Sequence, residues 1–323
     1  MKYRILGRTK LKVSEIGLGG HEYRRWLPGQ RDIERFNRTQ HERNELIKRA
    51  VDAGINYFDT THAEEAESLG LALKALNRRD DLHIAIMIFH LFRRMSEKLP
   101  SEWRQMILDD VEEKLKLLHT DYADILTILD PENHYSPEHL TAALETFREL
   151  KRKGKIGFFG ASSHQPSFLA EVMRRYDCFD TVMVRYNYHL QEARDILFPL
   201  AKALDVGVVI MKPFAWPYYG IPFTRFGPVE GEQDIYTPAQ TCLRWILRSP
   251  EVAIVVPGMN DMAELEENLG AITAEEGEID EKILARYLQA AQSQGKLKLK
   301  AMVKDPYLDI SHYAKQALTQ LGE

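Results

Sequence analysis

The sequence is poor in cysteine. Its 323 residues include only two cysteines, Cys178 and Cys242. So low a count excludes a disulfide framework and a metal site built from thiolates. It is typical of proteins in the reducing cytoplasm, which is where we expect this protein to be located.

Two further absences narrow the class of protein. The formal net charge is only −5, so the chain has no global excess of positive charge, and we expect no nucleic-acid partner. The chain also has no run of about 18 apolar residues, and the charged start MKYRILGRTK lacks the apolar segment of a signal peptide. We therefore expect no association with a membrane.

What the sequence does contain is an alternation of short β-branched runs with longer amphipathic segments. We predict eight strands, at Glu15–Gly19, Asn56–Asp59, His83–Ile88, Asp124–Leu129, Ile156–Ala161, Thr181–Tyr186, Gly207–Met211 and Val252–Val256. The predicted helices span roughly 39–53, 65–77, 101–118, 137–153, 165–175, 192–205, 237–248 and 262–270. Thr39 and Glu42 have the spacing of a capping box at the start of the first helix. Eight strand–helix pairs in one chain predict an α/β fold of the (β/α)8 barrel type.

The two ends of the chain extend this barrel. The stretch KYRILGRTKLKVSE, ahead of the first strand, predicts a β-hairpin that plugs the lower end of the barrel. The tail at 271–323 is helical and then basic. We predict a single domain over 1–323, with its core at about 2–270. A doubly wound sheet is the second alternative, but IGLGGHEY lacks the G-x-G-x-x-G spacing that such a sheet would favour.

In barrels of this type, functional residues follow the C-terminal ends of the strands. The residues at these positions are Gly20, Asp59, Met87 to His90, Leu129, Asp130, Ser162 to His164, Tyr186, Asn187, Met211, Lys212, Pro257 and Gly258. We expect the functional site to be assembled from them.

Several stretches, in the right order, resemble the aldo-keto reductase family over at least residues 2–270. They are KYRILGRTKLKVSEIGLGG, RAVDAGINYFDTT, TDYADIL, LKRKGKIGFFGASSH, FDTVMVRYN, DVGVVIMKPFA, LRWILRSPEVAIVVPGMND and ELEENL. The resemblance implies a (β/α)8 barrel that reduces carbonyl groups with NAD(P)H. It also implies a catalytic tetrad of Asp, Tyr, Lys and His.

In that tetrad the tyrosine donates a proton, the lysine lowers the pKa of the tyrosine, the aspartate holds the lysine, and the histidine orients the substrate oxygen. Asp59 fills the aspartate position. The following loop, in DTTHAEEAESLG, is two residues shorter than the family pattern, and Glu64 stands where the tyrosine is counted. Met87 and Leu129 occupy the lysine and histidine positions. Because methionine and leucine exchange no protons and glutamate is normally ionised, we predict that the standard chemistry is lost.

The remaining polar residues at this end have two interpretations each. Asp59 is either a re-used acid or a strand-end carboxylate that accepts backbone hydrogen bonds, and we favour the second. His62 and Glu64 either form an acid/base pair with Asp59 or cap the next helix, and we favour the cap. Three other polar residues lie in loops on the same face, without the spacing of metal ligands: His90, Asp130 and His134. We expect no metal site.

The resemblance also implies a dinucleotide groove, which the sequence retains in part. Family members hold the nicotinamide carboxamide with a Ser-Asn pair and a Gln, whereas these positions are Ser162-Ser163 and Met183 here. The implied cofactor contacts are Ser162, Ser163, Met183, Met211, Lys212, Gly258, Met259, Glu267 and Asn268. Since GMNDMAE at 258–264 has no Lys or Arg for a 2′-phosphate, we expect NAD(H) to bind weakly and NADP(H) to bind no better.

Arginines gather in two loops at the same end of the predicted barrel: Arg24, Arg25, Arg31, Arg35, Arg38, Arg93 and Arg94. Together with Arg185 and Lys212 they have the chemistry to receive a carboxylate or phosphate of a small-molecule ligand. The alternative, which we slightly favour, is a solvated loop whose charge is balanced by Glu22, Asp32 and Glu34.

Three functions follow from these patterns. The first is a barrel that has lost the standard catalytic residues and binds a nucleotide or a small anionic ligand. The second is an NAD(H)-dependent oxidoreductase of carbonyl or sugar-like substrates, with a replacement acid drawn from four tyrosines in predicted mouth loops: Tyr23, Tyr135, Tyr218 and Tyr219. The third is a non-redox lyase or isomerase that uses Asp59, Glu64 and Asp130.

Overall fold

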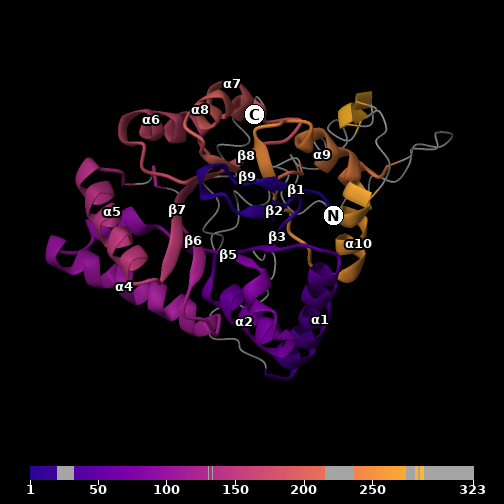
Figure 1. Cartoon of the computed structure of the whole chain (residues 1–323), viewed down its shortest axis with the longest axis horizontal. Helices are drawn as coiled ribbons and strands as arrows, with labels where there is room; N and C mark the ends of the chain where they lie inside the picture. The colour runs from indigo at the N-terminus through magenta and orange to yellow at the C-terminus, as the bar shows by residue number, and fades with distance from the viewer. Residues whose placement is uncertain are drawn as a thin grey trace, which may run out of the picture.

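The structure, a computed structural model, describes residues 1–19, 33–129, 131–132, 134–214, 236–273, 281–282 and 284–286. Its centre is an eight-stranded parallel sheet in the order β10-β9-β8-β7-β6-β5-β4-β3 (Figure 1). The strands are β3 (Leu18–Gly19), β4 (Tyr57–Thr60), β5 (His83–Ile88), β6 (Ala123–Leu129), β7 (Ile156–Ser163), β8 (Thr181–Arg185), β9 (Gly207–Met211) and β10 (Val252–Val255). Their Val- and Ile-rich sequences suit strands that are covered on both faces.

The sheet closes on itself between its first and last strands. Gly17 N–H donates to the Val255 carbonyl at 2.8 Å, and Val255 N–H donates to the Glu15 carbonyl at 2.9 Å. Gly19 N–H donates to the Pro257 carbonyl at 3.2 Å. These bonds join the two edges of the sheet, so the predicted (β/α)8 barrel is confirmed and the doubly wound alternative is excluded.

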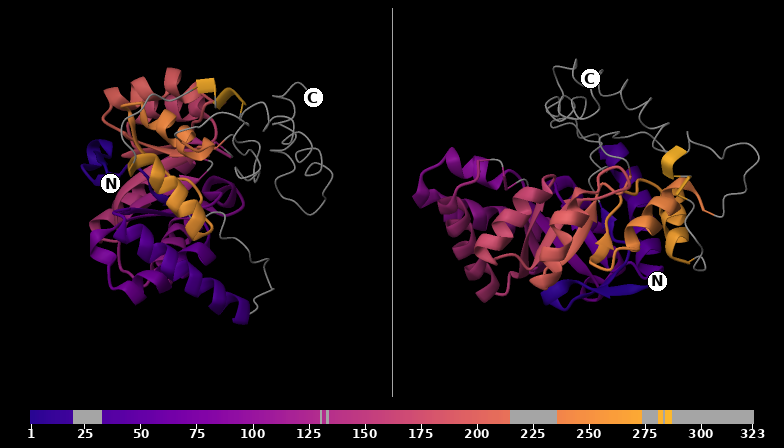
Figure 2. Two further views of the ribbon diagram at one scale, coloured as in Figure 1. Left: turned by 90° about the vertical axis from the view of Figure 1, so that its right-hand side faces the viewer. Right: turned by 90° about the horizontal axis from the view of Figure 1, so that it is seen from above.

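Helices connect the strands and surround the barrel (Figures 1 and 2). They are α1 (Ile33–Asp52), α2 (Ala63–Leu76), α3 (Leu91–Ser96), α4 (Pro100–Leu117), α5 (Pro137–Arg152), α6 (Pro166–Tyr176), α7 (Glu192–Ile196), α8 (Phe198–Ala203), α9 (Pro238–Leu247) and α10 (Met262–Thr273). Four of them, α4, α5, α6 and α9, begin with proline, whose fixed φ suits the first helical turn. Among the helices that the structure describes, none has the length and apolarity required to cross a membrane.

The packed interior has two parts, one inside the barrel and one outside it. The inner cluster contains Tyr57, Ala85, Met87, Ile125 and Met183, whose side chains come from β4, β5, β6 and β8. The outer cluster lies between the strands and the helices. Because side chains alternate across a strand, each residue two positions from an inner-cluster residue on a strand also faces the barrel interior.

The N-terminal hairpin plugs one end of the barrel, as predicted. Strand β1 (Tyr3–Ile5) pairs antiparallel with β2 (Lys12–Ser14), and the right-hand view of Figure 2 shows this indigo hairpin across one end of the barrel. Leu6 and Val13 belong to the inner cluster. Gly7, with φ +50°, approaches the backbone of Gly207 so closely that a Cβ atom would overlap it.

Some predicted boundaries were wrong. Helix α1 begins at Ile33, so it runs through Thr39, and the Thr39–Glu42 spacing does not mark its start. The predicted strand at Glu15–Gly19 is reduced to β3, because before Leu18 the only β-bridge to the described strands is that of Ile16 with Val255. The segment predicted as one helix over 192–205 is divided into α7 and α8. Most of the predicted tail at 271–323 lies outside the described residues.

Candidate functional site

The candidate site lies at the mouth of the barrel, the end where the strands reach their C-terminal residues. Met87 on β5 and Leu129 on β6 contact the inner cluster. Asp59 on β4 lies two residues after Tyr57, an inner-cluster residue, so it faces the same interior. The structure therefore brings together the three side chains that the sequence placed at one mouth.

Asp59 is a buried carboxyl group. Its residue is only 8% exposed, and its Oδ1 atom accepts no hydrogen bond from the residues that the structure describes. Burial, reinforced by the negative charge of Glu65, raises the pKa of Asp59 to about 8, against the opposing influence of Lys114 and Lys212. At neutral pH Asp59 is therefore mostly protonated and uncharged.

The carboxylate next to Asp59 is Glu65, not Glu64. Glu65 is buried and accepts hydrogen bonds from Thr61 N–H at 2.7 Å and His62 N–H at 3.1 Å, which caps the start of α2. Glu64 is exposed in the first turn of the same helix. The predicted site residue Glu64 is thus placed one position too early, because helical geometry turns position 65 inward. The loop after Asp59 thus caps helix α2, which is the interpretation that the sequence favoured.

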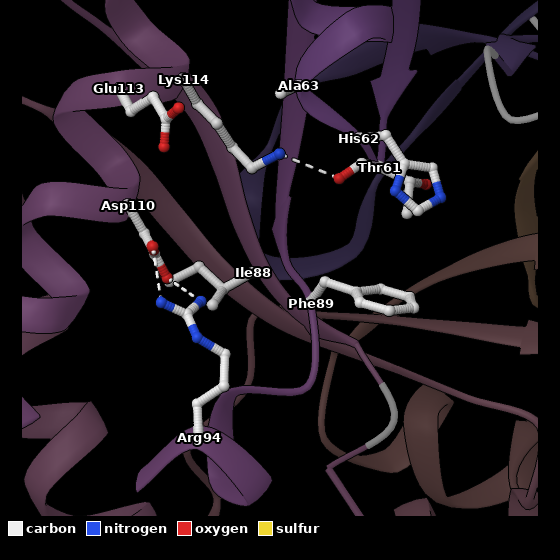
Figure 3. A pocket seen from close by; sticks show the side chains of 9 residues that line it. All are labelled: Thr61, His62, Ala63, Ile88, Phe89, Arg94, Asp110, Glu113 and Lys114. Atoms are coloured by element: carbon white, nitrogen blue, oxygen red, sulfur yellow. Dashed lines mark hydrogen bonds and ion pairs between the residues drawn. The ribbon is translucent and has the colours of Figure 1, made fainter. Parts of the chain in front are cut away.

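Lys114 is a site residue that the sequence analysis missed. It projects from α4, and its Nζ donates to the Thr61 carbonyl at 2.9 Å (Figure 3). Burial lowers the pKa of Lys114, while the charges of Glu65, Asp110, Glu113 and Asp59 raise it. A signal was present in the sequence, because Lys114 lies three residues after the buried Val111 and four before the buried Leu118, on the apolar side of its helix.

Cationic groups gather on the other side of the mouth. Arg185 ends β8 two residues after the inner-cluster Met183, and its register partner is Met211, the last residue of β9. Lys212 follows Met211 directly. Burial, followed by the charges of Lys212 and Arg185, lowers the pKa of His164 to about 3, so this histidine is neutral. Lys212 also lowers the pKa of Asp59, which places its positive charge within electrostatic range of both groups.

The serines at the implied carboxamide position are fully buried. Ser163 Oγ accepts a hydrogen bond from Gln165 N–H at 2.9 Å, and Ser162 Oγ donates to the sulfur of Met211 at 3.9 Å. Met183 is buried in the inner cluster. These side chains form a largely apolar wall with few hydrogen-bonding groups directed at a ligand.

The implied phosphate-binding end lies between β10 and α10. Gly258 forms a bridge with Gly19, and the side chain of Met259 is buried in the outer cluster, so Met259 packs the core and contacts no ligand through its side chain. The start of α10 is occupied by the chain's own carboxylates: Asn260 N–H donates to Glu264 at 2.7 Å, and Glu264 N–H donates to Asp261 at 2.9 Å.

Two further implied contacts lie later in α10. Asn268 is buried. The carbonyl of Glu267 accepts a hydrogen bond from Gln240 Nε2 at 2.9 Å. The bond from Gln240 thus joins α9 to α10 at Glu267.

Several predicted residues lie outside the described part of the chain. They are Gly20, Tyr23, Arg24, Arg25, Arg31, Asp130, Tyr218 and Tyr219, together with the side chains of Arg35 and Arg38. Of the predicted arginines that are described, Arg93 pairs with Glu97 and Arg94 pairs with Asp110. No group of three potential metal ligands occurs among the described residues.

Tyr135 is the one predicted replacement acid within the described residues. Its ring packs against Phe92 and Phe168. Burial, with a hydrogen bond to Tyr176, raises its pKa to about 12. A phenol with so high a pKa is a poor proton donor.

Comparison with known proteins agrees with this architecture. The model of the Aldo/keto reductase family matches residues 15–219 and 226–287. An uncharacterized oxidoreductase, YqkF, of Bacillus subtilis is 24% identical over 85% of this chain and 92% of its own. L-galactose dehydrogenase of Arabidopsis thaliana is 25% identical over 84% of this chain and 88% of its own.

A similar solved structure is the holo form of aldo-keto reductase AKR11C1 from Bacillus halodurans. Its TM-score is 0.64 at 24% identity, over 91% of this chain and 96% of that one, which shows a shared fold. The family typically binds NAD(P)H. Because the family model covers most of the sequence, the chain belongs to the aldo/keto reductase family.

Proposed function

We propose that this barrel binds a small anionic ligand at its mouth and does not carry out the standard carbonyl reduction of its family. The observation that carries the proposal is the composition of the mouth. Its inward residues on β4, β5 and β6 are a protonated Asp59 followed by two apolar side chains, Met87 and Leu129. These three residues therefore include no tyrosine phenol, lysine ammonium or histidine imidazole that could transfer a proton to a substrate carbonyl.

The anionic class of the ligand follows from Arg185 and Lys212. Burial lowers the pKa of Arg185, against the charges of Glu192 and Glu132, yet a guanidinium remains protonated at neutral pH. Asp59 is neutral and does not cancel these cations. A carboxylate or phosphate placed between Arg185 and Lys212 would receive charge-assisted hydrogen bonds.

A dinucleotide fits this mouth poorly. The carboxamide wall is largely apolar, and Asp261 and Glu264 place negative charge at the helix start where a phosphate would bind. We therefore propose that NAD(H) binds weakly and that NADP(H) binds no more tightly. The cations of the mouth would instead bind the acidic group of another small molecule. When bound, a nicotinamide would supply a hydride.

The test is a set of binding measurements. Calorimetry with NADH, NADPH, inorganic phosphate and acetate should show weak dinucleotide binding, and anion binding that is lost in Lys212→Gln. The matched control is Lys202→Gln, an exposed lysine of α8. Submicromolar NADPH binding would contradict the proposal, and so would anion binding that is unaffected by Lys212→Gln.

A second candidate function is supported by the raised pKa of Asp59. A carboxyl group that is protonated at neutral pH can donate a proton, so Asp59 has the chemistry of the acid in an NAD(H)-dependent oxidoreductase of carbonyl or sugar-like substrates. Turnover that is abolished by Asp59→Asn, and retained in Tyr→Phe variants of the mouth loops, would favour this candidate over the first.

A further inference from the structure

A separate cavity lies beside the mouth, between the ends of β4 and β5 and the helices α2, α3 and α4 (Figure 3). Its volume is about 140 Å³. The lining residues are Thr61, His62, Ala63, Ile88, Phe89, Arg94, Asp110, Glu113 and Lys114. Lys114 lines this cavity and also lies within electrostatic range of Asp59, whereas Arg185 and Lys212, the cations of the proposed anion site, do not belong to the lining.

Of the four charged side chains in the lining, Lys114 and Glu113 can bind a charged ligand. Arg94 and Asp110 neutralise each other through two hydrogen bonds of 2.5 and 2.9 Å. Lys114 donates to the Thr61 carbonyl, the one acceptor it has among the described residues, which leaves two of the three ammonium N–H groups for a ligand. Glu113 is exposed and forms no ion pair within the described part of the chain.

From this arrangement we infer that the cavity binds a small zwitterion of the α-amino acid class. The ligand carboxylate lies at Lys114, beside the amide of Ala63, which as the first residue of α2 has no acceptor within the helix. The ligand ammonium lies at Glu113. Ile88 and Phe89 form the apolar wall that faces the side chain.

The charge of the lining limits the class of ligand. A phosphate dianion would place extra negative charge beside Asp110 and Glu113, so the balanced lining favours a molecule without net charge. A volume of about 140 Å³ is enough to hold a small amino acid. This inference goes beyond the proposed function, because it concerns a different site and a different ligand.

Three matched probes test the inference on the full chain by calorimetry or by NMR chemical-shift titration. They are L-alanine, propionate, which lacks the ammonium, and ethylamine, which lacks the carboxylate. We expect L-alanine to bind, and each truncated probe to bind at least about tenfold more weakly, since each loses a charge-assisted hydrogen bond. Equal affinity for propionate and L-alanine, or no detectable binding of L-alanine at millimolar concentration, would overturn the inference.

Variants locate the binding. Glu113→Gln and Lys114→Met should each weaken L-alanine binding about tenfold or more, while Lys116→Met, an exposed lysine of the same helix, should leave it unchanged. Glu113 is exposed, so its variant keeps the test valid if Lys114→Met fails to fold. Loss of L-alanine binding in the mouth variant Lys212→Gln, with retention in Glu113→Gln, would place the ligand in the mouth and contradict the inference. If the mouth binds no anion, the proposed function fails, but the expected effects of Glu113→Gln and Lys114→Met on L-alanine binding stay the same.

Discussion

At the scale of single residues, the protonation state of Asp59 controls the charge of the mouth. Below its raised pKa of about 8 the group is neutral, so in the proposed anion site it does not compete with a ligand for Lys212 and Arg185. Above that pH an aspartate anion lies within electrostatic range of Lys212. The mouth thus changes from a cationic to a partly self-neutralised site over a narrow range of pH.

The first prediction concerns stability. An ordinary aspartate pKa is 3.8, and the folded value is about 8, so between these values the folded state holds a proton that the unfolded state releases. The stability contributed by this proton is fully present below about pH 4 and is lost as the pH rises through about 8. Compared with Asp59→Asn, the wild type should lose up to about 1.4 kcal/mol of unfolding free energy per pH unit in this window.

Urea unfolding at a series of pH values checks this difference. Asp109→Asn, at an exposed position of α4, is the control and should follow the wild type throughout. A difference between wild type and Asp59→Asn that does not change between pH 5 and pH 8 would show that Asp59 is ionised in the folded protein.

The second prediction concerns the pH dependence of ligand binding. Because ionised Asp59 competes for Lys212, affinity for acetate should fall as the pH rises through about 8. In Asp59→Asn the affinity should stay level across the same range. Calorimetry from pH 6 to pH 9 measures both, and an identical decline in the two proteins would assign the effect to another group.

At this scale the sequence predicted the identities at the mouth but not every orientation. Asp59, Met87 and Leu129 were found because they lie at the ends of predicted strands and match tetrad positions of the family that the sequence resembles. Glu65 and Lys114 were missed because each lies on a helix, where the inward face depends on where the helix starts and what it packs against. A shift of one residue separates exposed Glu64 from buried Glu65.

At the scale of elements, the junction between β4 and α2 depends on Glu65. Its carboxylate accepts hydrogen bonds from the backbone N–H groups of Thr61 and His62, which have no acceptor within the helix. The same carboxylate raises the pKa of Asp59, so this cap is linked to the electrostatics of the mouth.

A third prediction follows for this junction. Glu65→Ala removes the hydrogen bonds to the buried Thr61 N–H and the partly buried His62 N–H, and should destabilise the protein by about 2 kcal/mol. The adjacent exposed Glu64→Ala should change stability by no more than about 0.5 kcal/mol. Chemical denaturation of the two variants compares them directly. A larger effect at Glu64 than at Glu65 would contradict the placement of these residues.

The starts and ends of elements were less predictable than their order. The sequence offered a capping box at Thr39, yet α1 begins at Ile33. A capping motif lowers the energy of a helix start only where the preceding residues leave the helix, and neighbouring sequence alone does not determine that. Helix α3 was absent from the prediction, since it has only six residues, Leu91–Ser96.

At the scale of the whole molecule, the barrel and its plug were predictable because they rest on the repeated strand–helix pattern and on a local hairpin. Arg4 holds the hairpin against the barrel by donating to the carbonyls of Leu247, Ser249 and Val252. The sequence pattern did not predict how closely the plug packs against the barrel. That packing depends on contacts between residues far apart in the chain, such as Gly7 with Gly207.

Two glycines with positive φ provide the fourth prediction. A Cβ at Gly7 (φ +50°) would meet the backbone of Gly207, whereas a Cβ at Gly154 (φ +69°) would have no neighbouring atom within 4 Å. Gly154→Ala should therefore cost about 1 kcal/mol from backbone strain alone, and Gly7→Ala should cost clearly more because the plug must also move. Equal losses in thermal or chemical unfolding would contradict the close fit of the plug.

We propose that this member of the family does not perform its standard chemistry, and steady-state assays of NADH and NADPH oxidation measure that chemistry itself. The assay uses a broad panel of aldehydes, ketones and quinones, with the wild type and Asp59→Asn measured side by side. We expect turnover far below about 1 s⁻¹ with every substrate and no difference between the two proteins. Turnover of about 1 s⁻¹ or more in the wild type with any substrate of the panel would contradict it.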